Sequence, residues 1–143
     1  MRIFNTEELR PNQLEKIYAT LGGRYTFWER LRKKRVGSPM MFYQEGSEVL
    51  DQLQNKATDE IRINFELLKD GLLIRIAERT NSYFIPILAK DISTIQLRKD
   101  KVKSYLKLTI TSAPPIQLWG SIDQYFGWQD FINTSFLVDR LKD

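Results

Sequence analysis

The stretch IRINFELLKDGLLIRIA, residues 61–77, carries the clearest indication of fold in this sequence. Its first half alternates apolar and polar residues, which is the period of a strand with one buried face. Asp70-Gly71 in the middle is a preferred pair for a two-residue type I′ turn. Such a turn pairs apolar with apolar and acid with base, so the stretch predicts an antiparallel hairpin. The expected cross-strand pairs are Leu67 with Ile74, Phe65 with Ile76, and Glu66 with Arg75.

Short apolar segments continue after the hairpin, and the links between them are rich in turn-forming residues. Consecutive strands with short links predict an antiparallel meander. Pro86 has no amide hydrogen to donate, so we expect its strand at an edge of the sheet or at a bulge. A brief earlier strand is predicted within PMMFYQ, residues 39–44. The segments after the hairpin are Tyr83–Leu88, Ile92–Leu97, Tyr105–Thr111 and Ile116–Trp119.

Helical periodicity appears before and after this strand-rich region. Pro11 suits a first helical position and Gly22-Gly23 a helix stop, which predicts an amphipathic helix between them. Ser47 suits the cap of a short helix. Ser121, with Gln124 three residues later, forms a capping-box pattern before a C-terminal helix. The apolar face of that helix steps by three or four residues: Ile122, Tyr125, Trp128, Ile132 and Phe136.

These elements together predict an α+β protein. We expect a strongly bent antiparallel sheet, or a partly open barrel, of six or seven strands capped by the C-terminal amphipathic helix. A chain of 143 residues with 42% apolar residues is in the range of one globular domain. We therefore divide the sequence into a basic helical extension, residues 1–38, and a barrel domain, residues 39–143.

Residues 60–140 resemble a bacterial pleckstrin-homology-like (PH-like or GRAM-like) domain. The stretch FELLKDGLLIRIAERTNSYFIPILAKDISTIQL is similar to the hairpin, the "I-P" strand and the "DI..I" strand of that family. Trp128 resembles the tryptophan that eukaryotic members carry in their terminal helix. The resemblance implies a scaffold that binds lipids, proteins or peptides and is seldom a catalyst. Phosphoinositide-binding members concentrate bases around the first hairpin, where this chain has only Arg62, Lys69, Arg75 and Arg79.

The composition removes most catalytic chemistry. The chain contains neither histidine nor cysteine, so Ser-His-Asp and Cys-His catalysis, imidazole or thiolate metal sites and disulfides are excluded. Its only paired glycines, in TLGGRY, lack the Lys-Ser/Thr of a phosphate loop. We expect no enzymatic activity, no cofactor and no metal site. The lack of cysteine and of any long apolar run predicts a cytoplasmic protein, with peripheral association at the inner membrane face.

Positive charge gathers in two segments. YTFWERLRKKR, residues 25–35, places aromatic rings ahead of a run of bases, and RKDKVKSYLK, residues 98–107, carries five bases against one acid. Both segments are candidates for binding an anionic surface. The candidate binding residues are Arg30, Arg32, Lys33, Lys34, Arg35, Arg98, Lys99, Lys101 and Lys103, with Tyr25, Phe27 and Trp28 as interfacial or packing aromatics.

Each of these features has a structural alternative. Phe27 and Trp28 would pack on the barrel while the neighbouring charges are solvated, and the lysines of residues 98–107 would guard an exposed strand edge. The aromatic set at Tyr125, Phe126, Trp128 and Phe131 would form a core face or a subunit interface.

The expected function is that of a non-catalytic binding module. We expect it to dock to a protein partner or to itself, with added attraction to anionic membranes. The alternative is nucleic-acid binding through residues 30–35 and 98–107. Against that alternative, the strand faces show no interleaving of bases and aromatics along the sequence.

Overall fold

A single antiparallel sheet of eight strands organises the computed structural model, which describes residues 2–26, 29 and 36–142. The order across the sheet is β1-β5-β4-β3-β2-β8-β7-β6, so the two outermost strands do not meet and the sheet stays open. The α+β class is therefore confirmed. The strands are β1 (Phe4–Asn5), β2 (Met41–Glu45), β3 (Arg62–Leu68), β4 (Gly71–Glu78), β5 (Asn81–Leu88), β6 (Ile92–Lys99), β7 (Lys103–Ile110) and β8 (Ile116–Ser121).

The sequence predicts six or seven strands, and the described residues form eight. The strand that the sequence does not reveal is β1, because its two residues are too few to show an alternating pattern. Helices form where the sequence predicts them at Pro11, Ser47 and Gln124. The Ser47 side chain accepts a hydrogen bond from the amide of Leu50, as an N-cap does. The helices are α1 (Pro11–Thr20), α3 (Glu48–Lys56) and α4 (Gln124–Asn133), and short 3₁₀ helices are η1 (Thr6–Glu8), η2 (Ala89–Asp91) and η3 (Phe136–Arg140).

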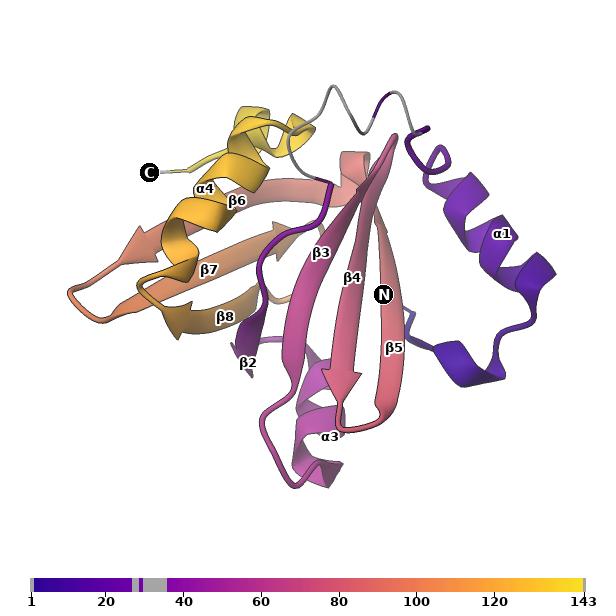
Figure 1. Cartoon of the computed structure of the whole chain (residues 1–143), viewed down its shortest axis with the longest axis horizontal. Coiled ribbons are helices and arrows are strands. Elements are labelled where there is room, and N and C mark those ends of the chain that lie inside the picture. Colours follow the sequence, from indigo (N-terminus) through magenta and orange to yellow (C-terminus); the bar gives the residue numbers. More distant parts are fainter. Residues whose placement is uncertain (1, 27–28, 30–35, 143) are drawn as a thin grey trace.

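β2 joins two meanders at the middle of the sheet. It pairs with β3 on one side and with β8 on the other. The expectation of one continuous meander is wrong between β5 and β6, which lie far apart in the strand order. η2 redirects the chain there, and Figure 1 shows β3–β5 running steeply while β6–β8 run across them. The sheet is therefore strongly bent.

The β3–β4 hairpin forms, but with a register two residues away from the expected one. Leu68 pairs with Gly71, so Lys69 and Asp70 make the turn, and Phe65 lies opposite Ile74. A slip of two residues keeps every side chain on its own face, so the alternation cannot detect it. The expected contact of Glu66 with Arg75 survives as a diagonal pair at 2.6 Å.

The turn is held by the segment that follows α1. The amide of Asp70 donates to the carbonyl of Leu21 at 2.7 Å, and the amide of Lys69 donates to that of Gly23 at 3.2 Å. Gly71 lies so close to β5 that a Cβ there would be 2.3 Å from the carbonyl oxygen of Ile87. These long-range contacts place the turn one residue earlier than local turn preference does.

α4 closes the inner side of the bent sheet. Trp128 and Phe131 of this helix are fully buried, and both rings belong to an edge-to-face cluster with Phe65 of β3. The ring centroids are 5.0 Å apart for Phe65 and Trp128, and 5.8 Å apart for Trp128 and Phe131. The predicted capping box is half formed, since the Gln124 side chain accepts from the amide of Ser121.

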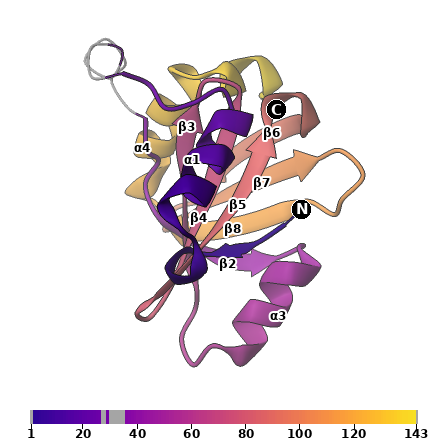
Figure 2. The same cartoon turned by 90° about the vertical axis from the view of Figure 1, so that its right-hand side faces the viewer.

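α1 covers the outer face of the β3–β5 half, as Figure 2 shows. Ile17, Tyr18 and Leu21 pack there against Leu73 and Phe84. The first half of β4, Gly71–Ile74, is therefore buried on both faces, which explains why it is apolar at consecutive positions. The segment from 1 to 38 thus adds a strand and a helix to the sheet, while the division at residue 38 stays a prediction.

Pro86 lies where the sequence predicts an exposed edge. β1 pairs with β5 only at Tyr83 and Phe84. Pro86 is opposite Leu73 of β4, and no described strand pairs with it on the other side. A residue without an amide hydrogen is therefore tolerated here.

Candidate anionic-surface site at the β6–β7 hairpin

The β6–β7 turn is built around the carboxylate of Asp100. One of its oxygens accepts hydrogen bonds from the amides of Val102 at 2.8 Å and Lys103 at 2.7 Å, and the other accepts from the hydroxyl of Tyr105. The two backbone amides stabilise the ionised form and lower the pKa of Asp100 below its usual value. The carboxylate is thus fixed by the turn, and Asp100 is exposed, as are the three neighbouring lysines.

Two exposed apolar side chains lie beside these lysines. Val102 at the turn is 67% exposed and Phe126 in the first turn of α4 is 58% exposed, the highest values among the large hydrophobic residues in the described ranges. The amide of Ile122 donates to the carbonyl of Val102 at 3.0 Å, which ties the hairpin to the start of α4. We call Lys99, Lys101, Val102, Lys103 and Phe126 the basic end.

Cation–π contacts fix two lysines of the basic end. The ammonium of Lys99 lies 4.7 Å from the ring centroid of Tyr125 and 5.0 Å from that of Phe126. The ammonium of Lys103 lies 4.9 Å from the ring of Trp119. Both charges are therefore positioned over aromatic faces, and the basic end presents cations and rings together.

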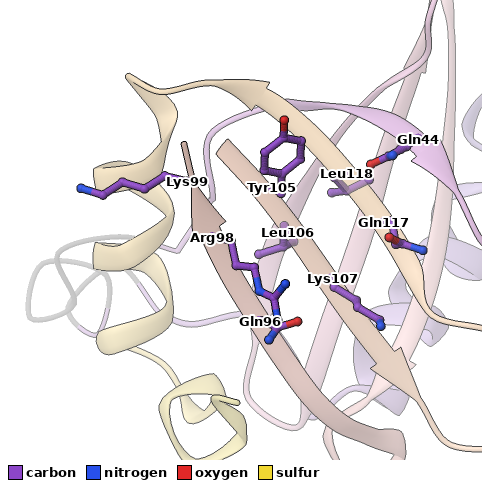
Figure 3. A pocket seen from close by; sticks show the side chains of 9 residues that line it. All are labelled: Gln44, Gln96, Arg98, Lys99, Tyr105, Leu106, Lys107, Gln117 and Leu118. Atoms are coloured by element: carbon purple, nitrogen blue, oxygen red, sulfur yellow. The ribbon is translucent and has the colours of Figure 1, made fainter. Parts of the chain in front are cut away.

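Arg98 lies apart from the basic end, on the outer face of the sheet. Together with Tyr105 and Lys107 it borders a shallow hollow with a volume of about 440 Å³. Figure 3 shows that Lys99 instead extends toward α4, away from Arg98. The predicted segment 98–107 thus spans two adjoining surfaces, because Lys99 also lines the hollow and the ammonium of Lys103 lies over the ring of Trp119, which pairs with Tyr105.

The candidate residues of the opening stretch divide differently. Tyr25 is half-buried and packs against the main core, and burial is the main cause of the raised pKa of its hydroxyl. It is a packing residue. The remaining candidates lie outside the described residues, so the anchor hypothesis for them stays a prediction: Phe27, Trp28, Arg30, Arg32, Lys33, Lys34 and Arg35.

The aromatic set on α4 serves two purposes. Trp128 and Phe131 belong to the core, whereas Phe126 is exposed and Tyr125 is half-buried. Sequence reasoning therefore missed Phe126 and Val102 as surface residues. The available signals were the position of Val102 between two lysines and the position of Phe126 outside the apolar face of its helix.

Edge protection stays an alternative explanation for the lysine cluster. The chain's own C-terminal segment lies along β6, where the amide of Lys142 donates to Ile95 at 2.9 Å and the side chain of Arg140 donates to Ile92 at 3.1 Å. The lysines lie at the opposite end of β6 and in the turn, beyond this covered part of the edge.

The described residues offer few other sites. Within them, no group of three or more Asp, Glu, His or Cys side chains is placed to hold a metal ion. The helices of the described ranges include none with the length and apolar character needed to cross a membrane. Comparisons with protein-family models, with curated proteins and with solved structures find no match for this chain.

Proposed function

We propose that this chain is a non-catalytic binding module on a PH-like scaffold, and that its basic end docks on anionic membrane surfaces. The observation that carries the proposal is the grouping of Lys99, Lys101 and Lys103 around the exposed Val102 and Phe126. The lysines attract acidic headgroups, while the apolar side chains enter the interface between headgroups and acyl chains. Docking to a protein partner or to a second copy of the chain stays a prediction.

The strand order supports the PH-like scaffold. Two meanders, β3–β5 and β6–β8, are joined through β2, and a C-terminal helix closes the inner side of the bent sheet. Such an arrangement leaves the hairpin tips free to carry binding residues, because the core is complete without them. The side chains of Lys101 and Val102 accordingly contribute nothing to the buried core.

The first prediction concerns the basic end. Wild-type protein should co-sediment with phosphatidylcholine vesicles that contain phosphatidylserine, and not with pure phosphatidylcholine vesicles. Lys101→Glu should weaken binding by at least roughly fivefold, since each lysine near such a surface contributes about 1 kcal/mol. Val102→Asp should weaken it further, because it removes an inserting side chain and adds a repelled charge.

Matched controls separate docking from general charge and stability effects. Lys90→Glu and Val138→Asp change an exposed lysine and an exposed valine outside the basic end, and both should bind as the wild type does. If all four variants bind equally, the basic end is not the docking surface and the proposal fails.

A second prediction separates the basic end from the opening stretch. Changing Arg32, Lys33 and Lys34 together to Glu should leave part of the vesicle binding in place, because the basic end remains. Added salt should weaken that remaining binding, since electrostatic attraction supplies much of it. Complete loss in this variant, with full binding by Lys101→Glu, would assign docking to the opening stretch instead.

A further inference from the structure

The outer face of β6, β7, β8 and β2 carries a row of side chains that only the strand pairing brings together. Arg98 pairs with Tyr105, Tyr105 with Trp119, and Trp119 with Phe42. Neighbouring strands are about 4.8 Å apart, so the paired side chains lie next to one another at about that spacing across the face. The ring centroids of Phe42 and Trp119 are 5.0 Å apart. We call Arg98, Tyr105, Trp119 and Phe42 the outer row.

A second row runs beside the outer row and is rich in amides. Gln96 pairs with Lys107, and Lys107 pairs with Gln117. These residues, with Gln44 of β2, line the hollow of about 440 Å³, and Figure 3 shows Gln96 and Arg98 on β6 beside Lys107 and Tyr105 on β7. No acidic residue lines this hollow. Amides can donate and accept hydrogen bonds, and the three cations that line the hollow, Arg98, Lys99 and Lys107, favour an anionic ligand.

We propose that this outer face binds single-stranded nucleic acid. Every base has a π face that stacks on an aromatic ring, with about 1–3 kcal/mol per stacked base, and Arg98, Lys103 and Lys107 are placed to meet phosphates. The amides of the second row can meet the edges of unpaired bases. A duplex keeps its bases stacked inside and its edges paired, so it can use the cations but not the rings.

The charge distribution sets the direction in which a strand would lie. Beyond Phe42 the row continues to Arg62, and a neighbouring hollow, which Phe42 and Trp119 also line, carries three acids against two bases: Asp59, Glu60 and Glu78 against Arg62 and Arg79. Phosphates are repelled there. The nucleic acid should therefore lie over the Arg98 side of the face, across Tyr105 and Lys107.

The test measures anisotropy of a labelled oligodeoxythymidine of about a dozen nucleotides, within the site size of such surfaces. It is compared with the same strand in a duplex. The single strand should bind at least about tenfold more tightly, since one stacked base accounts for that factor. Lys107→Glu should weaken single-strand binding by fivefold or more and lower its salt slope by about 0.7.

Trp119→Phe provides a second measurement, and its expected result differs from the result of a folding defect. The variant keeps an aromatic ring, so its affinity for the single strand should be nearly that of the wild type. The bound strand should quench Trp119 fluorescence in the wild type, and this part of the quenching should be absent in the variant. Phe126→Ala and Lys90→Glu change no residue of either row and should bind nearly as the wild type does. Equal affinity for single strand and duplex, equal binding of polyglutamate, or normal binding by Lys107→Glu would each overturn the proposal.

Lys103 belongs to both surfaces, so variants at residues of one surface alone separate this outcome from vesicle binding. Phe126→Ala should reduce vesicle binding and leave the oligonucleotide affinity unchanged, whereas Lys107→Glu should do the reverse. Failure of the oligonucleotide assay with normal vesicle binding would overturn only the outer-face proposal. Failure of vesicle binding with selective single-strand binding would overturn only the membrane proposal.

Discussion

Trp128→Ala should lower the free energy of unfolding by about 3–5 kcal/mol, whereas Trp128→Phe should lower it by about 1 kcal/mol or less. Trp128 is fully buried between Phe65 and Phe131, so alanine leaves a large cavity at the centre of the core. Phenylalanine keeps a ring in contact with both neighbours. The two substitutions therefore separate the contribution of the aromatic ring to stability from that of the indole nitrogen.

The indole nitrogen is the reason why Trp128→Phe should lower the free energy of unfolding only slightly. The Nε1–H of Trp128 is buried and has no hydrogen-bond partner among the described residues. An unsatisfied buried donor costs about 1–3 kcal/mol, and Trp128→Phe removes that donor together with part of the ring volume. The lost packing and the relieved donor then largely offset each other.

Urea unfolding followed by far-ultraviolet circular dichroism measures both variants, because Trp fluorescence changes with the substitution itself. Phe131→Leu is the matched control: it removes as many heavy atoms from the same cluster and relieves no polar group. It should destabilise the protein more than Trp128→Phe does. The reverse order would show that the indole nitrogen is satisfied and that this account of Trp128 is wrong.

The elements of this fold could be predicted from the sequence because their signals are local. Alternation identified β3, short apolar segments between turn-forming residues indicated the other strands except β1, and caps and periodicity identified α1, α3 and α4. The partners of β2 could not be predicted, since they depend on residues far along the chain. The predicted register of the β3–β4 hairpin is wrong for a related reason, because Leu21 and Gly23 hold its turn from outside the hairpin.

The two candidate surfaces also combine features that the sequence shows with features that only the fold produces. The lysines of the basic end are visible as a charge run, but the exposure of Val102 and Phe126 depends on how the hairpin meets α4. The outer row draws its members from four strands between residues 42 and 119, so nothing along the sequence joins them. The sequence shows no interleaving of bases and aromatics, and the strand pairing produces it.

Gly46→Ala should destabilise the protein by more than about 3 kcal/mol, against about 1–2 kcal/mol for Gly23→Ala. Both glycines have positive φ values, +121° for Gly46 and +84° for Gly23, so alanine is strained at either position. Only Gly46 also lacks space: a Cβ there would lie 1.7 Å from the carbonyl oxygen of Pro115. A Cβ built on Gly23 would meet no atom of another part of the chain within 4 Å.

The contact at Gly46 cannot relax cheaply, because its neighbour is backbone and lies just before β8. Moving Pro115 away would pull β8 from β2, the strand that joins the two meanders. We therefore expect a large drop in the urea midpoint for Gly46→Ala, or loss of soluble protein, while Gly23→Ala folds with a modest loss. Similar midpoints for the two variants would mean that the β2–β8 junction is loose, and that β2 does not hold the two halves of the sheet together.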